Sequence, residues 1–216
     1  MQPRTASPER LGSFSDGVMA VVITLMVLEL KAPASARLAA LLPLWPTAVS
    51  YAVSYAFIAV IWVNHHHLLR FVRRADQRIL WLNFAHLFLV SLLPFATAWM
   101  ATTRLGPTPV ALYAALFMAV NLAYAAFEHA VIRQAGTREF PARARRAARQ
   151  RWATTVLVFG AAALLALVAP IPAVLLICAA LGAYVRPDIS RTLSRLRTLV
   201  PAPRTHAARK LASVEI

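Results

Sequence analysis

Long uncharged stretches alternate with short, strongly basic segments along this chain. A transmembrane helix needs about 20 mostly apolar residues, because it must cross a hydrocarbon core about 30 Å thick. Six stretches approach this length and are predicted to span a membrane: residues 12–30, 42–64, 79–101, 109–132, 152–169 and 171–186. We therefore expect an all-α integral membrane protein, with a six-helix transmembrane domain over residues 1–186 and a basic tail over residues 187–216.

Two prolines separate the last two stretches. Pro170 and Pro172 lack a backbone N–H, and each also restricts the residue before it. A tight hairpin between two short spans is therefore favoured over one long helix, and a re-entrant pair stays as an alternative.

Composition supports a membrane fold rather than a soluble one. The chain is 60% hydrophobic and only 14% charged, which is too apolar for a soluble domain of 216 residues. A formal net charge of +15 is also typical of nucleic-acid-binding proteins. Here, however, the basic residues lie in a few polar segments between the apolar stretches, so we expect no nucleic-acid partner.

The basic residues are divided unevenly between the two sides of the six-span arrangement. Only Lys31, Arg37 and Arg104 fall on one side, and the other 20 of the 23 fall on the opposite side. Cytoplasmic loops are enriched in Lys and Arg, so both termini are predicted to be cytoplasmic. Basic cytoplasmic loops of this kind are expected to contact anionic lipid.

The basic tail has an apolar face of its own. Ile189, Leu193, Leu196 and Val200 would share one side of a helix, with arginines around them. This pattern suits an interfacial helix on anionic lipid. A solvated basic tail that only enforces the topology is an equal alternative.

Ionisable side chains within predicted spans are few. Such groups are costly in a membrane and are candidates for function by default. In the topology above they all lie in the cytoplasmic half of the membrane or at its inner edge. They are Asp16, His65, His66, His67, His86, Glu128 and His129.

The first predicted span has two distinct faces. Successive residues of a helix are about 100° apart, so an aliphatic stripe with one hydroxyl falls within an arc of about 100°. This stripe consists of Val21, Thr24, Leu25 and Leu28. It either lines a central axis or serves ordinary helix packing, which explains most stripes of Val and Leu in membranes.

Asp16 lies about 140° around the helix from Val21. If the stripe lines an axis, Asp16 therefore points back into its own subunit. Asn64, Asn83 and the histidines at 65–67 are then expected to satisfy its carboxylate.

The three consecutive histidines invite a metal hypothesis, since imidazole is the commonest zinc ligand. Neighbouring helical residues point about 100° apart, so these side chains do not converge on one ion while the helix continues. Structural hydrogen bonding is the favoured reading, ahead of pH sensing and metal binding. We expect no resident metal and no cofactor.

Known catalytic and channel signatures are missing from the sequence. It contains no Gly-rich phosphate loop, no His-Glu-x-x-His and no Gly-x-Ser-x-Gly, so we do not expect an enzyme. It also lacks the Thr-Val-Gly-Tyr-Gly filter and the regularly spaced arginines of a voltage sensor. Any ion conduction is therefore expected to be voltage-insensitive and to use another design.

Several motifs resemble the prokaryotic branch of the transmembrane protein 175 potassium-channel family. The resemblance is close over the first hundred residues and rests only on the number of spans beyond them. Its motifs are Arg10-x-x-x-Phe14-Ser15-Asp16, Trp62-Val-Asn64-His65-His66-His67 and Leu80-Trp81-x-Asn83.

The resemblance implies a homotetramer whose first helices surround the pore, with hydrophobic side chains forming the constriction. Val21, Leu25 and Leu28 would be the constricting layers, and Thr24 a polar ring associated with potassium preference. The narrowest layer of relatives resembles Ile or Leu, so Val21 implies a wider gate. A structural clasp would orient the pore helix through Arg10, Phe14, Ser15, Asp16, Asn64, His65 and Asn83.

The resemblance thus implies a leak-type, potassium-selective or potassium-preferring channel in the inner membrane of a prokaryote, with potassium as the permeant ion. A proton-coupled secondary transporter is the alternative, using Asp16, Glu128 and the cytoplasmic-side histidines as a relay. A membrane-bound metal or haem protein is a third possibility.

Overall fold

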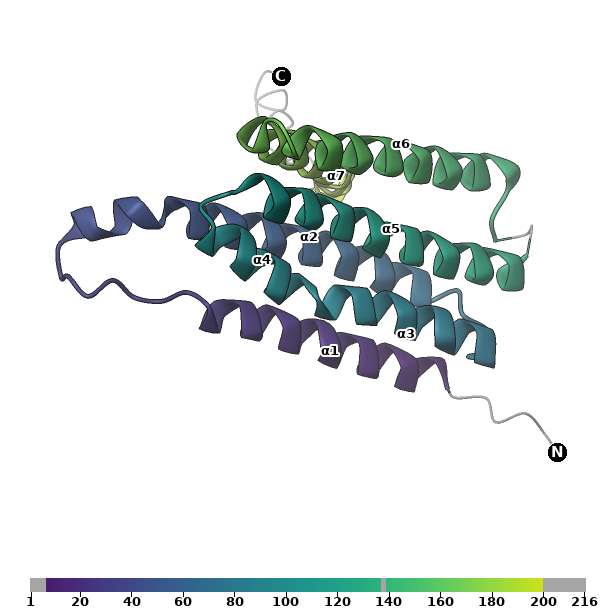
Figure 1. Ribbon diagram of the computed structural model, residues 1–216. Helices are drawn as coiled ribbons and strands as arrows, with labels where there is room; N and C mark the ends of the chain where they lie inside the picture. Colours follow the sequence, from purple (N-terminus) through teal and green to yellow (C-terminus); the bar gives the residue numbers. More distant parts are fainter. Residues whose placement is uncertain (1–6, 137–138, 200–216) are drawn as a thin grey trace, which may run out of the picture. The chain divides into compact units, whose positions relative to one another are not determined.

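The computed structural model describes residues 7–136 and 139–199, with side chains up to residue 184 (Figure 1). Within these ranges every element is a helix. In chain order they are α1 (Pro8–Leu28), η1 (Leu38–Leu44), α2 (Trp45–Leu69), α3 (Gln77–Ser91), α4 (Leu93–Thr102), α5 (Pro107–Ala135), α6 (Ala142–Ala166) and α7 (Pro170–Leu199).

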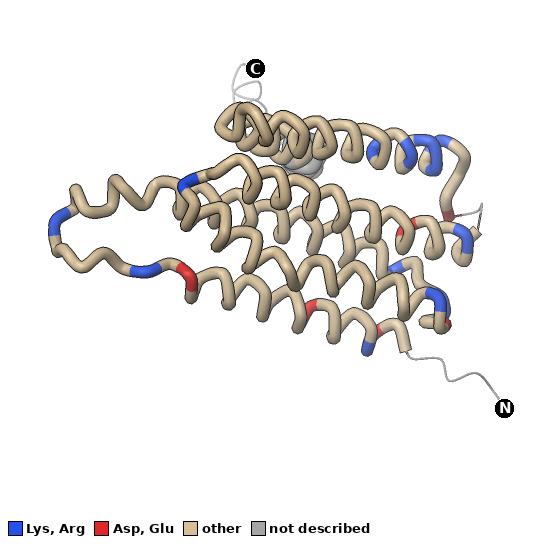
Figure 2. Tube along the Cα trace, in the orientation of Figure 1, with Lys and Arg blue, Asp and Glu red and all other residues tan. Residues whose placement is uncertain are grey.

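The chain divides into two compact units, residues 1–181 and 182–216. In the first unit, α1 packs against α2, α3 and α4, and α5 packs against α3, α4 and α6. Figure 2 shows the charged residues of this unit mainly near helix ends and in connections. The second unit contains the last part of α7, which is helical to Leu199. The side chains of the predicted apolar face of the tail lie outside the described residues.

Four stretches in the described part are long and apolar enough to cross a membrane: Pro8–Leu28, Leu38–Leu69, Gln77–Thr102 and Pro107–Ala135. They overlap the first four predicted spans, and the chain is a multi-pass membrane protein. The last two predicted spans differ from the elements found. The helix α6 begins ten residues before the predicted span, in its basic segment, and the apolar helix Pro170–Tyr184 is short. The count of six spans stays a prediction.

Local signals explain where several helices begin. The Ser7 side chain accepts a hydrogen bond of 3.2 Å from the Arg10 backbone N–H, and Asp76 accepts one of 2.9 Å from the backbone N–H of Ile79. Both are N-caps, which satisfy donors that a first helical turn leaves unpaired. Prolines occupy the first turns of α1, α2, α4 and α5, where their missing N–H costs nothing.

The third predicted span is two helices rather than one. The break falls at Leu92, between α3 and α4. Pro94 has no N–H for the carbonyl of Val90, so the regular ladder is interrupted there. Instead, the Leu92 N–H donates to the carbonyl three residues back, that of Leu89, at 3.2 Å. The predicted span over residues 79–101 runs through Pro94 without this break.

The helix α2 is longer than predicted at its C-terminal end. It continues to Leu69 and includes the three histidines, which therefore keep helical spacing. Between α6 and α7 only residues 167–169 are non-helical, so a tight turn stands where the prolines predicted one.

Aromatic stacking joins three helices in the core of the first unit. The rings of Phe57 on α2 and Phe117 on α5 stack with centroids 3.6 Å apart. Phe159 of α6 meets Phe117 edge-on at 5.6 Å. Such pairs add to the stabilisation that burial alone provides.

A chain of buried hydroxyl groups joins α2, α4 and α5. Thr97 donates to the Leu93 carbonyl at 2.7 Å, so its oxygen must accept from Ser54, also at 2.7 Å. The oxygen of Ser54 in turn accepts from the Tyr113 hydroxyl at 2.7 Å. All three side chains are buried, and this order of donation satisfies every proton in the chain.

We expect Ser54→Ala to lower the free energy of unfolding in detergent by about 1–2 kcal/mol, because it leaves the Tyr113 hydroxyl buried without an acceptor. Tyr113→Phe removes only a terminal donor and is expected to cost less. The double variant should be more stable than the sum of the single effects, since no orphaned hydroxyl remains on α5. Denaturant unfolding followed by tryptophan fluorescence measures this cycle, and strict additivity would contradict the coupling.

Candidate functional site

The first helix buries one face and exposes the other. Its buried residues recur at helical spacing: Leu11, Ser15, Met19, Val22 and Met26. They pack against α2, α3 and α4. The described residues leave the opposite face of α1 uncovered.

The predicted pore residues all lie on this exposed face. The exposed fraction is 56% for Val21, 47% for Leu25 and 75% for Leu28. Thr24 is exposed as well, and its hydroxyl donates to the Val21 carbonyl at 2.8 Å. That bond uses the only proton of the hydroxyl and leaves its oxygen free to accept. An apolar face of this kind, on a helix that spans a membrane, meets either lipid or another protein surface.

Asp16 is held by a residue outside the predicted set of partners. The indole N–H of Trp62 on α2 donates to its Oδ1 at 2.8 Å. We had expected Asn64, Asn83 or the three histidines to do this. Trp62 stands one helical turn before His65 and His66, so it reaches the same region of α1 from the N-terminal side.

Ser15, rather than Asp16, makes the contact with Asn83. The amide Nδ2 of Asn83 donates to Ser15 Oγ at 3.0 Å, and Ser15 Oγ donates to the Leu11 carbonyl at 2.9 Å. The amide oxygen of Asn83 lies 2.7 Å from Nε2 of His65. Because an amide oxygen only accepts, Nε2 of His65 carries the proton. All three side chains are fully buried, so α1, α2 and α3 share one buried polar network, in which Nδ1 of His65 has no hydrogen-bond partner among the described residues.

His65 lies in a stack of rings. Phe127 of α5 lies on it at a centroid distance of 5.4 Å, and His86 of α3 lies parallel to it at 5.7 Å. The Nδ1 of His86 is 3.2 Å from the Val120 carbonyl and therefore donates to it. His86 is not among the predicted clasp residues, although it follows Asn83 by three residues on the same helical face.

Other residues of the predicted clasp are less enclosed. The ring of Phe14 is 53% exposed and meets Phe84 edge-on at 5.6 Å. Arg10 is exposed, and its backbone N–H is what binds the N-cap. The structure therefore divides the predicted clasp into a buried part around Ser15 and a partly exposed part around Phe14.

The remaining histidines point in different directions. His66 stacks on Trp62 at 5.4 Å, whereas Nδ1 of His67 approaches the Val63 carbonyl at 2.7 Å. Among the residues that the structure describes, no three His, Cys, Asp or Glu side chains gather as a metal site would require. Glu128 forms an ion pair of 3.0 Å with Arg151 of α6. Its partner is thus on a different helix from the partner of Asp16.

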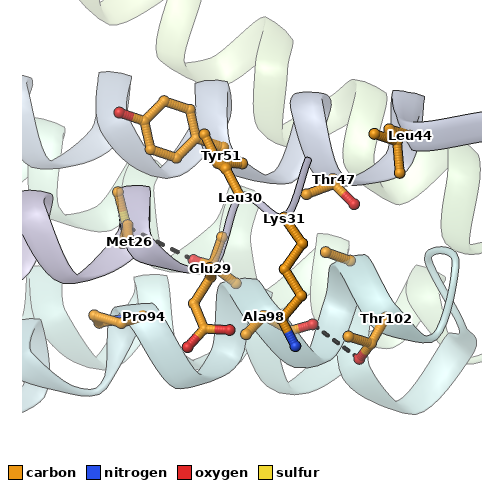
Figure 3. A pocket seen from close by; sticks show the side chains of 12 residues that line it. Met26, Glu29, Leu30, Lys31, Leu44, Thr47, Tyr51, Pro94, Ala98 and Thr102 are labelled. Carbon is orange, nitrogen blue, oxygen red and sulfur yellow. Dashed lines mark hydrogen bonds between the residues drawn. The ribbon is translucent and has the colours of Figure 1, made fainter. Parts of the chain in front are cut away.

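A small pocket lies at the C-terminal end of α1, between this helix, α2 and α4 (Figure 3). Its volume is about 230 Å³. In the figure the side chains of Glu29 and Lys31 extend toward α4, where Ala98 and Thr102 lie. Thr97, the last member of the hydroxyl chain, also lines it. In the predicted topology this pocket opens on the side opposite the cytoplasm.

Comparison with known proteins gives a family for these features. Residues 10–94 match the family model described as endosomal/lysosomal potassium channel TMEM175. A protein named as a potassium channel from Chryseobacterium sp. (strain P1-3) is 42% identical over 127 residues, which are 59% of this chain and 66% of the relative. A protein of the same description from Chamaesiphon minutus is 36% identical over 56% of this chain and 64% of its own length. The chain thus spans just under two thirds of these curated relatives.

A vertebrate relative carries a different name. The mouse protein named endosomal/lysosomal proton channel TMEM175 is 35% identical over 102 residues, which are 42% of this chain and 20% of that protein. The matched family and these relatives are ion channels and not enzymes.

The fold agrees with a solved structure. The crystal structure described as a lysosomal potassium-selective channel TMEM175 homologue from Chamaesiphon minutus superposes with a TM-score of 0.72 at 27% identity. The match covers 83% of this chain and 97% of that one, so it extends beyond the first hundred residues. The buried Ser15 network and the apolar face of α1 lie in the segment that the TMEM175 family model matches, and the chain is similar to members of this family there.

Proposed function

We propose that this chain is the subunit of a potassium-selective or potassium-preferring leak channel, in which the exposed face of α1 lines the pore. The observation that carries this proposal is the division of α1 into a buried polar-and-methionine face and an exposed face with three aliphatic side chains. Potassium is proposed as the ion because the bacterial relatives and the matched crystal structure are named as potassium channels.

The pore requires several copies of the chain. One helix encloses no channel, so the proposal includes a homo-oligomer, with four subunits as the resemblance implies. Gly17 would let the α1 helices of neighbouring subunits approach closely at the cytoplasmic end of the proposed pore. It falls within the same arc as Val21 and Leu28, and a side chain at this position would meet nothing within 4 Å in its own subunit. We place the assembly in the cell membrane of a prokaryote, since two of the relatives named above are bacterial.

Selectivity in such a pore follows from dehydration. An aliphatic ring offers no ligand to replace ion hydration and gates by dewetting. Potassium gives up its water more readily than sodium, so it passes preferentially, but with weaker discrimination than a ring of carbonyls provides. The ring of Thr24 oxygens would supply the one polar layer among the aliphatic ones.

The constriction is tested by shortening one of its side chains. We expect Leu25→Ala to raise potassium flux into liposomes several-fold and to lower the ratio of potassium to sodium flux, because a wider apolar ring is wetted more easily. Leu164→Ala is the matched control, since Leu164 is also an exposed leucine, on α6, with 73% of its surface exposed. Equal fluxes for the two variants, or no flux from well-folded wild-type oligomer, would overturn the proposal.

Gly17 provides a test in the opposite direction. Gly17→Leu adds a side chain on the pore-facing arc without a clash inside the subunit, so we expect normal folding and a potassium flux at least fivefold lower. Size-exclusion chromatography and thermal unfolding check assembly and folding. An unchanged flux would mean that this arc faces lipid.

The transporter alternative predicts another outcome for Asp16. Its partners argue against a relay, because Asp16 bonds to Trp62 and Glu128 pairs with Arg151. Asp16→Asn keeps an oxygen that accepts from Trp62, so we expect the variant to retain most of the potassium flux. Loss of a saturable, proton-coupled uptake with the fold intact would favour the transporter. The mouse relative is named a proton channel, so proton conduction is measured separately. Liposomes with a pH gradient and no potassium distinguish a proton flux from a potassium flux.

A further inference from the structure

A groove lies between α5 and α6, away from the exposed face of α1. Its volume is about 890 Å³, within the range of sites that hold organic ligands. It is lined by Leu122, Ala125, Ala126, Glu128, His129, Ile132, Arg133, Gly136, Ala142, Arg145, Ala148, Arg149 and Trp152. Small residues supply five of these positions and leave space between the helices.

The two ends of the groove differ in polarity. On α5 the lining passes from Leu122 through alanines to Arg133, and on α6 it passes from Trp152 back to Arg145. Trp152 follows the last arginine of α6, and no charged residue follows it in that helix. A tryptophan at the boundary between charged and apolar sequence is typical of the membrane interface. The groove therefore has an apolar end directed toward the membrane interior and a basic end directed out of it.

The basic end carries positive charge that forms no ion pair within the described part of the chain. Three arginines line it: Arg133, Arg145 and Arg149. The one carboxylate in the lining, Glu128, is already paired with Arg151, which lies outside the lining. Among the residues that the structure describes, the two ion pairs involve none of the three lining arginines. Figure 2 shows these basic positions gathered on the first half of α6 and at the end of α5.

We propose that this groove binds one anionic phospholipid. The three arginines hold the phosphate, because a guanidinium group donates two parallel hydrogen bonds to phosphate oxygens. One acyl chain lies along Leu122, the alanines of α5 and the ring of Trp152. A free phosphate or a soluble anion would use only the basic end, whereas a phospholipid matches both ends and their order across the interface. The site is independent of ion conduction through the pore.

The test is lipid retention by the full chain, measured by native mass spectrometry. Protein in detergent is given equal amounts of phosphatidylglycerol, which is anionic, and phosphatidylcholine, which is zwitterionic. We expect the wild type to retain phosphatidylglycerol preferentially. Arg145→Gln/Arg149→Gln should lower that retention about thirtyfold, from a contribution of about 1 kcal/mol for each of the two basic residues at a membrane surface.

A matched control removes the same charge from the same helix. Arg143 and Arg146 are exposed on α6 but do not line the groove, so Arg143→Gln/Arg146→Gln should leave retention unchanged. Equal losses in the two double variants would show a diffuse charge effect and overturn the site. Equal retention of the two lipids by the wild type would overturn it as well.

A second variant tests the apolar end. Ala126→Trp fills the space beside the alanines of α5 while all the arginines stay, so phosphatidylglycerol retention should fall to the level of phosphatidylcholine. Thermal unfolding confirms that each variant is folded. If Ala126→Trp retains the lipid, or if millimolar inorganic phosphate displaces it from the wild type, the groove binds an anion rather than a phospholipid.

Discussion

The rotation of α1 about its own axis is the constraint on which the functional reading depends. In hydrocarbon an unpaired polar group is costly, so the polar side chains of a spanning helix must turn toward partners. Ser15 bonds to Asn83 and Asp16 bonds to Trp62. Because α2 and α3 hold these partners, α1 is fixed with its methionines buried and Val21, Leu25 and Leu28 outward. The polar contacts of Ser15 and Asp16 therefore also determine that the apolar stripe of α1 faces outward.

Much of this arrangement could be predicted from sequence, because it follows from helical periodicity and charge. The first four spans and the separation of Asp16 from the Val21 stripe need only a period of 3.6 residues. The break at Leu92 was also visible in principle, since Pro94 removes a backbone donor. It was missed because proline is common within transmembrane helices, where neighbouring helices often compensate for it.

Which side chains pair between helices could not be predicted from the sequence. The resemblance groups Asn83 with Ser15 and His65, but it includes Trp62 only as part of a motif. Choosing between Trp62 and the histidines as the partner of Asp16 depends on how α1 and α2 are shifted along each other, which periodicity does not reveal. The hydroxyl chain from Tyr113 through Ser54 to Thr97 was missed for the same reason. Single Ser, Thr and Tyr residues in apolar segments carry no sign of their partners.

Different kinds of evidence support the functional assignments for α1 to α3 and for α5 and α6. The family model covers residues 10–94, which include most of α1, all of α2 and α3 and their polar network, and it stops before α5 and α6. In the first part, contacts such as Asn83 with Ser15 belong to a matched family segment. In the second part, the charge of α6 is a property of this sequence, where Arg145 and Arg149 recur one helical turn apart and so point to the same side. Arginines also lie on other faces of α6, as Arg143 and Arg146 do, so the spacing alone assigns no ligand. The groove is assigned one because Arg145 and Arg149 meet Arg133 at one end of a lining whose other end is apolar.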